Sequence, residues 1–252
     1  MNAEALRQIR GGTGPAGMLL GVDYQREPVP IRLFRTEPTY VTLVGGVWAL
    51  RILVFRALAL GARVLVTTAD PRPWQGLGEW ATGRPDRLLL GPAHHPPATS
   101  SPRTPLLVVT DGTQHDHQPP ATSTLRTPPR TVNDETQPRA VTDETQPRAV
   151  TEETQAELGP WQTRITVVHE LTQERANTLL GADLVMLQRL TAAEAAVARA
   201  AAGTALKLSA RDASRLQEMT PEMLALLGGG ANRYVWLAPT SIEQQFHGPP
   251  QR

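Results

Sequence analysis

The sequence predicts an α/β protein whose mainly parallel sheet carries helices on both faces, which is a three-layer arrangement. Residues 39–70 contain an apolar strand, a glycine pair, an apolar helix and a second apolar strand in one unbroken unit. This order is typical of a βαβ unit, whose two strands are parallel and whose crossover is right-handed. Apolar runs of strand length recur at 105–111 and 164–169, and 40% hydrophobic residues suffice for a buried core.

The chain is expected to begin with a flexible lead-in over residues 1–16. Residues 18–22 and 29–34 then form two short predicted strands, and the polar sequence DYQREP between them suits a turn. We therefore expect an N-terminal hairpin. It leads to a strand at 40–44, whose nearly continuous apolar sequence favours a central position in the sheet, covered on both faces.

The predicted helix at 47–60 is interrupted by polar residues only at Arg51 and Arg56. A helix this apolar must be covered on most of its sides, by the sheet and by another element or a partner. Gly61 is a suitable stop for it, and the strand at 63–68 completes the unit.

Residues 41–66 are apolar enough to be tested as a membrane span. Arg51, Arg56 and Arg63 interrupt the segment, and each central arginine costs roughly 2.5–3.5 kcal/mol on insertion scales. Residues 1–12 also lack the apolar core of a signal peptide. We expect a chain without a transmembrane segment, cytoplasmic or peripheral to a membrane complex.

The composition changes in the middle of the chain. After a short irregular helix at 71–83 and a strand at 86–90, residues 91–160 hold twelve of the 23 prolines. Within this stretch, residues 131–155 repeat a nine-residue unit, DETQPRAVT, that has no apolar periodicity. Such a sequence cannot pack a core, so we expect a disordered insert over 112–157, formed by tandem expansion of a surface loop.

Regular structure is expected to resume at Trp161. Thr191 and Glu194 form a capping box at the start of an alanine-rich helix that ends near Ala202. The other predicted elements of this half are strands at 164–169, 183–190 and 234–238, helices at 173–180 and 210–227, and a loose tail at 241–252. The predicted organisation is a single α/β domain, residues 17–111 and 158–240, interrupted by the insert.

Charge and composition exclude several classes of function. The formal net charge is only +1, and no basic cluster of the kind that binds nucleic acid is present in the sequence. The chain has no cysteine, which excludes disulfides, thiolate metal sites and cysteine nucleophiles. No G-x-S-x-G elbow of a serine hydrolase is present either.

The glycine pair Gly45–Gly46 lies where a phosphate-binding loop would lie, between a strand and a helix. The P-loop template G-x-x-x-x-G-K-[ST] wraps phosphates with backbone N–H groups, and its lysine and hydroxyl contact phosphate and magnesium. Laid from Gly45, the template meets Leu50, Arg51 and Ile52 at its glycine, lysine and hydroxyl positions. The pair is interpreted as a close strand-to-helix turn, with weak anion binding at the helix N-terminus left open.

Two aspartates could belong to a site at the ends of predicted strands. Asp111 follows LLVVT, as the magnesium-binding acid of a Walker B strand does, but Gly112 follows it instead of a glutamate. Asp70 could act as a ribose-binding acid, although a dinucleotide fingerprint G-x-G-x-x-G is absent. We therefore predict no catalytic residue and no cofactor, and regard Gly45, Gly46, Arg51 and Asp111 as vestigial nucleotide-binding positions.

Four histidines in the proline-rich region were considered as metal ligands. All four lie in loop sequence rich in proline and threonine, at His94, His95, His115 and His117. Neither pair has a partner pair at the spacing of a zinc site. We predict no metal site.

The order of elements resembles that of FtsK/HerA-type P-loop ATPases, including the EccC-like ATPases of actinobacterial type VII secretion. A hairpin and an extended link lead to the glycine-turn strand in GMLLGVDYQREPVPIRLFRTEPTYVTLVGG, and PLLVVTD takes the Walker B place. The later segments follow in the same order: TRITVVHELT, ADLVMLQRLTAAEAAVARAAAG and GGGANRYVWLAP. The resemblance covers residues 17–240 apart from the insert, and it implies a P-loop or Rossmann-like fold.

The sequence departs from the family's pattern at the positions that bind nucleotide and magnesium, at Leu50, Arg51, Ile52 and after Asp111. The resemblance therefore implies a pseudo-ATPase that acts through protein contacts, with an active translocation ATPase as an expected partner. The alternative is a nucleotide- or small-molecule-binding α/β enzyme with its ligand at the strand ends near Gly45, Asp70 and Asp111. The first interpretation predicts strand ends filled by side chains such as Trp48, and the second predicts an open polar cleft.

Overall fold

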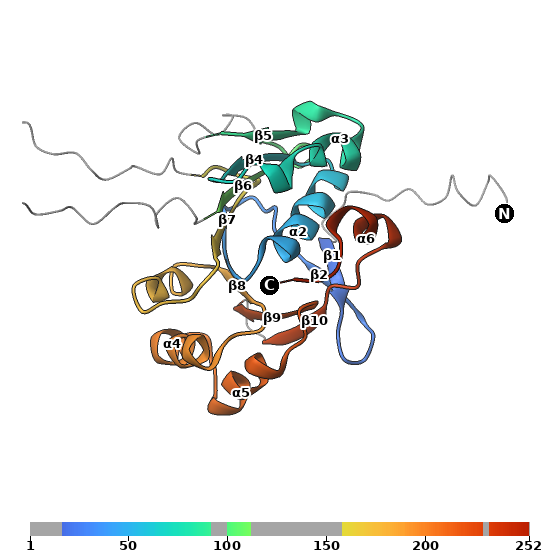
Figure 1. The fold of residues 1–252 in the computed structure, drawn as a ribbon. Coiled ribbons are helices and arrows are strands. Elements are labelled where there is room, and N and C mark those ends of the chain that lie inside the picture. Colours follow the sequence, from blue (N-terminus) through green and yellow to red (C-terminus); the bar gives the residue numbers. More distant parts are fainter. Residues whose placement is uncertain (1–16, 92–99, 112–157, 229–231, 252) are drawn as a thin grey trace, which may run out of the picture.

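The computed structural model of the chain describes residues 17–91, 100–111, 158–228 and 232–251. Within these ranges the strands form one ten-stranded sheet in the order β2-β1-β10-β9-β8-β3-β7-β6-β4-β5 (Figure 1). The predicted lead-in, the predicted insert at 112–157 and the four histidines of the proline-rich region lie outside the described residues. The α/β class, the mainly parallel sheet and the N-terminal hairpin are confirmed.

The sheet has a parallel part and an antiparallel part. The strands of the parallel part are β3 (Thr39–Val44), β4 (Arg63–Thr67), β5 (Leu88–Leu90), β6 (Leu106–Asp111), β7 (Gln162–Val168) and β8 (Leu184–Leu187). The antiparallel part consists of β1 (Met18–Val22), β2 (Pro28–Ile31), β9 (Met223–Gly228) and β10 (Arg233–Trp236). The N-terminal hairpin therefore extends the sheet by pairing β1 with β10.

Helices cover the two faces of the sheet (Figure 1). One face carries α2 (Val47–Ala59), α3 (Leu77–Thr82) and α6 (Ser241–His247). The other face carries α4 (Ala192–Ala202) and α5 (Ala210–Glu218). Short 3₁₀ turns complete the connections at η1 (Arg72–Trp74), η2 (Pro85–Arg87) and η4 (Ala176–Leu179).

The strand alternation divides the core into two layers. Leu43 belongs to the cluster beneath α2, whereas its neighbour Val44 belongs to the cluster beneath α4. Successive side chains of a strand point to opposite faces, so a central strand covered on both faces must be apolar at consecutive positions. The nearly continuous apolar sequence of β3 is explained by this position.

Helix α2 is held by burial and not by its caps. Gly46 precedes it without a side-chain cap, and residues such as Leu50, Leu53 and Val54 are fully buried. The predicted cover of this helix is present: the sheet lies on one side of it, and α6 packs on another side. Gly61 ends the helix with a φ of 89°, a conformation that glycine adopts without strain.

Two expectations for the C-terminal third were wrong. The region 210–227 was expected to be one helix, but α5 ends at Glu218 and Met223–Gly228 is strand β9. The tail at 241–252 was expected to be loose, but Ser241–His247 forms helix α6, and Thr240 caps it with a reciprocal hydrogen-bond pair to Glu243. The last strand, expected at 234–238, is Arg233–Trp236.

Substitution of Leu53 by alanine is expected to lower the free energy of unfolding by about 2–5 kcal/mol, because it leaves a cavity between α2 and the sheet. Leu89→Ala is the matched control, since Leu89 is 50% exposed on the edge strand and should change stability by only about 0.5 kcal/mol. Urea unfolding followed by circular dichroism measures both. Equal effects of the two substitutions would contradict the described core.

Candidate functional site

The carboxyl ends of the parallel strands bring polar groups together at one edge of the sheet. Strand β3 is followed by Gly45, β7 by His169 and β8 by Gln188, while Asp111 is the last residue of β6. The strand order places β7 between β3 and β6. In open α/β sheets, ligands bind at this edge, where connections leave towards opposite faces. We call Gly45, Gly46, Asp111, His169 and Gln188 the strand-end cluster.

The glycine turn is already occupied by a side chain of the protein. The N–H of Gly46 donates to Oε1 of Gln188 at 2.6 Å, and the N–H of Gly45 donates to the carbonyl of Val168 at 3.0 Å. A Cβ atom on Gly45 would collide with the carboxamide of Gln188. Glycine is therefore required here for the close approach of Gln188, and the first free amide of α2 donates to an oxygen of the chain itself.

Gln188 is fully buried, and its carboxamide connects three segments. Besides accepting from Gly46, it donates from Nε2 to the carbonyl of Pro221 at 2.8 Å and to that of Gln251 at 3.4 Å. Buried polar groups are retained when such partners satisfy them. Gln188 therefore links the glycine turn to the loop before β9 and to the C-terminal segment.

Asp111 is 3% exposed and has both carboxylate oxygens engaged. Its Oδ1 lies 2.5 Å from Nε2 of His169, and its Oδ2 accepts from the hydroxyl of Thr68 at 2.9 Å. The hydrogen bond with Asp111 raises the pKa of His169 against the opposing effect of burial, and a hydrogen bond with the backbone of Gly45 adds to the rise. The arrangement favours an imidazolium beside a buried carboxylate.

Asp70 is linked to Asp111 through Thr68. The backbone N–H of Asp70 donates to the hydroxyl of Thr68 at 3.2 Å, and this hydroxyl donates to the carboxylate of Asp111. The carboxylate of Asp70 itself forms a two-point ion pair with Arg72, with both N–O distances at 2.8 Å. The hydrogen bond from Arg72 lowers the pKa of Asp70, which is exposed to solvent.

Arg51, at the lysine position of the template, contacts α6. Its Nη2 donates to the carbonyl of Phe246 at 3.2 Å, and burial lowers the pKa of its guanidinium. Trp48 is 5% exposed, and its indole N–H donates to the carbonyl of Gly248 at 3.2 Å. Because the chain continues from there to Gln251, which contacts Gln188, residues 248–251 pass beside the glycine turn.

Two surface cavities are lined by residues outside the strand-end cluster. One, of about 180 Å³, is lined by Trp74, Gly76, Glu79 and Leu88, between α3 and β5. The other, of about 460 Å³, is lined by Glu222, Pro239, Gln244 and the segment 248–250. The second cavity adjoins the cluster, because its lining residues neighbour Pro221 and Gln251, whose carbonyls accept from Gln188.

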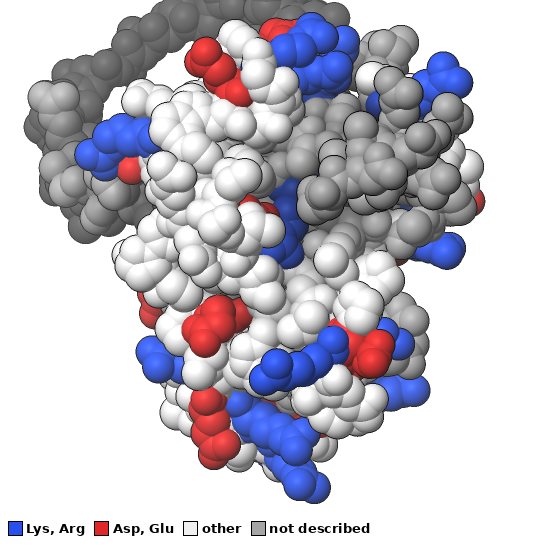
Figure 2. Space-filling view, turned by 90° about the vertical axis from the view of Figure 1, so that its right-hand side faces the viewer, with Lys and Arg blue, Asp and Glu red and all other residues white. Residues whose placement is uncertain are grey.

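The face of the molecule that carries α6 shows interspersed charges. In Figure 2 the basic and acidic side chains of the described residues on this face are interspersed within a mostly uncharged surface. Of the described residues, no group of three or more His, Asp or Glu side chains is placed to hold a metal ion. Among the helices that the structure describes, none has the length and apolar character that a membrane span requires.

His169 and Gln188 were missed as site residues at the sequence level. Each directly follows an apolar strand, in ITVVH and VMLQ. All parallel strands end at the same edge, so a polar residue immediately after such a run is a recognisable signal. The sequence was compared with models of known protein families and with curated proteins, and neither comparison gives a match.

The pair of His169 and Asp111 predicts a defined dependence of stability on pH. Because folding raises the pKa of His169, its contribution is fully present below the unfolded value of about 6.5 and is lost as pH rises through the folded value. His169→Gln should therefore flatten the decline of stability above pH 6.5 and cost about 1.5–3 kcal/mol at pH 6.5. Urea unfolding between pH 6.5 and 9 measures both effects.

The double variant with Asp111→Asn serves as the control for this pair. If the two side chains interact as described, the effects of the single substitutions will not add in the double variant. An identical pH slope in wild type and His169→Gln would show that the imidazolium is not stabilised by folding.

Proposed function

We propose that this chain is a non-catalytic relative of the FtsK/HerA-type P-loop ATPases and acts as an accessory or regulatory protein through contacts with other proteins. The resemblance implies type VII secretion as the setting and an active translocation ATPase as the partner. The observation that carries the proposal is the internal occupation of the strand-end cluster by side chains of the same chain.

Two groups that a nucleotide would need are engaged elsewhere. A phosphate requires free N–H groups at the start of the helix, but Gly46 donates to Gln188. A magnesium ion requires carboxylate and hydroxyl oxygens, but Asp111 binds His169 and Thr68. In effect, Gln188 supplies an oxygen where an anion would lie, and His169 supplies a cationic donor beside the acid.

The replaced template positions support the same proposal. Leu50 and Ile52, both residues of α2, are fully buried. Arg51 is held by α6, away from the strand-end cluster. Binding a nucleotide here would require the displacement of both Gln188 and residues 248–251, each of which has hydrogen-bond partners to lose.

Protein contacts remain available on the surface that carries Trp80. This side chain is 57% exposed on α3, whereas Trp74 is buried in the core. Large aromatic side chains with this exposure are common anchors of protein interfaces. The apolar helix α2 is covered by the sheet and by α6, so the Trp80 surface is more accessible than α2.

Titration of the purified protein with ATP, ADP and NAD, with and without magnesium, is expected to give no thermal shift and no heat of binding. A ligand that binds only the folded state at one hundred times its Kd would add about 2.7 kcal/mol of stability, which both methods detect. Magnesium-dependent ATP binding would overturn the proposal and would favour the alternative nucleotide-binding enzyme.

The accessory role is tested with a purified, active FtsK/HerA-type ATPase from the same organism. We expect this chain to bind it and to change its rate of ATP hydrolysis, and Trp80→Ala to weaken the binding at least about tenfold, equivalent to about 1.4 kcal/mol. Tyr24→Ala is the matched control, because Tyr24 is another exposed aromatic ring, on the N-terminal hairpin. Absence of any effect on the ATPase would refute the partner.

A further inference from the structure

The C-terminal arm, residues 239–251, is attached to α2 by a small number of polar contacts around a buried ion pair. Glu243 of α6 is 2% exposed, and its carboxylate accepts from Nε and Nη2 of Arg56 at 2.6 and 3.0 Å. The same guanidinium donates to the carbonyls of Leu20 and Leu237. Arg56 therefore ties the arm to β1 and to the end of the last strand.

His247 lies within this attachment but adds no hydrogen bond to it among the described residues. It is 7% exposed, and neither ring nitrogen has a hydrogen-bond partner among the described residues. Its ring packs edge-on against Phe55 of α2, with 5.6 Å between ring centroids. A neutral imidazole can be buried in this way at moderate cost, but an imidazolium without a partner cannot.

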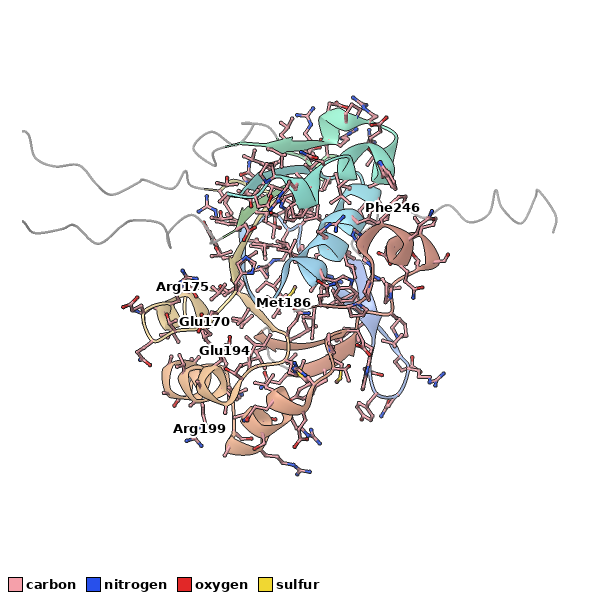
Figure 3. All side chains as sticks on the ribbon, in the orientation of Figure 1. Glu170, Arg175, Met186, Glu194, Arg199 and Phe246 are labelled. Atoms are coloured by element: carbon pink, nitrogen blue, oxygen red, sulfur yellow. The ribbon has the colours of Figure 1, made fainter. Side chains whose placement is uncertain are left out.

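The charges around His247 oppose its protonation. The pKa of His247 is lowered to about 4: burial is the largest cause, the positive charges of Arg51 and Arg56 on α2 contribute, and Glu243 on α6 acts in the opposite direction. Figure 3 labels Phe246 on α6. Its ring packs edge-on against Trp80 of α3. Burial also raises the pKa of Glu243, but hydrogen bonds from Arg56 and Thr240 outweigh this and keep it lowered.

The hinge of the arm holds backbone strain. Ala238, between β10 and α6, has a φ of 38°, a left-handed conformation that is unfavourable for a residue with a Cβ atom. Its carbonyl lies 3.5 Å from Nη2 of Arg56, the group that also binds Glu243. The contacts that dock the arm therefore also hold the hinge in this conformation, and release of the arm would relieve it.

We propose that the C-terminal arm is a pH-operated cover: protonation of His247 releases α6 from α2 and uncovers Trp48 and the glycine turn. The arm undocks as a unit, because residues 248–251 follow α6 directly, and among the described residues the hydrogen bonds that tie them to the rest of the fold come from Trp48 and Gln188. The sheet and the other helices stay folded. This regulation is separate from the proposed accessory function, since it concerns when the edge is exposed and not what binds there.

The size of the effect follows from proton linkage. The released His247 titrates near 6.5 and the docked one near 4, so each pH unit between these values favours release about tenfold. Between pH 7.5 and pH 5 the released fraction should therefore rise about 30-fold. Glu243 remains ionised over this range, so loss of the ion pair is not the trigger.

Hydrogen exchange followed by mass spectrometry tests the release, with rates at pH 7.5, 6 and 5 corrected for intrinsic chemistry. Protection of α6 should fall at least tenfold from pH 7.5 to pH 5, while that of β3 and β7 does not change. His247→Phe, which keeps the ring contact with Phe55 and cannot be protonated, should hold its protection at pH 5. An equal fall in this variant, or no fall in wild type, would overturn the proposal.

Ala238→Gly provides a second variant that does not alter the histidine. Glycine adopts the hinge conformation without strain, so the docked arm should become more stable and the midpoint of release should move to lower pH. If the arm of His247→Phe does not dock at pH 7.5, the shift of the release midpoint in Ala238→Gly tests the proposal instead. An unchanged midpoint in Ala238→Gly would contradict release through the hinge.

Discussion

The buried carboxamide of Gln188 is the interaction on which the strand-end edge depends. Parallel strands expose polar backbone groups at their carboxyl ends, and the following helix begins with N–H groups that lack partners within the helix. In this protein one side chain accepts from Gly46 and donates to Pro221 and Gln251. It therefore pairs the N–H of Gly46 at the start of α2 and binds the loop before β9 and the end of the arm.

Internal satisfaction of this edge has a chemical consequence. The features that attract a phosphate and a magnesium ion to such an edge are unpaired donors and an unpaired carboxylate. Gln188 pairs one of these donors, the N–H of Gly46, and His169 with Thr68 pairs the carboxylate of Asp111. Each of these hydrogen bonds would have to be broken before a phosphate or a magnesium ion could use the same group.

The parallel part of the fold could be predicted from the sequence because its hydrophobic pattern runs without a break. Strand, glycine pair, helix and strand follow one another in residues 39–70, and the hydrophobic pattern of each segment matches the element that it forms. The predicted capping box of Thr191 and Glu194 is also formed, because it depends only on residues three positions apart. These elements are specified locally, which is why they could be read without a structure.

The wrong secondary-structure predictions lie where tertiary contacts, and not the local sequence, determine the element. Residues 223–228 form a short leucine-rich run, and such a run fits a strand or a buried helix equally well. Helix α6 is polar overall and is ordered by the pairing of Glu243 with Arg56, which is 187 positions earlier in the chain. Its one local signal, the capping box between Thr240 and Glu243, is present in the sequence. The roles of His169 and Gln188 likewise depend on strand order, which no local pattern specifies.

The partly buried His169 and the buried His247 give the molecule opposite responses to acid. A fall in pH favours the charged form of His169, which lies against Asp111, and so strengthens the centre of the sheet edge. The same fall penalises His247, which lies between arginines without a hydrogen-bond partner among the described residues. Acid therefore loosens the cover while it stabilises the edge beneath. A local opening is favoured over global unfolding because the opposing linkages act on different elements, the arm and the parallel sheet.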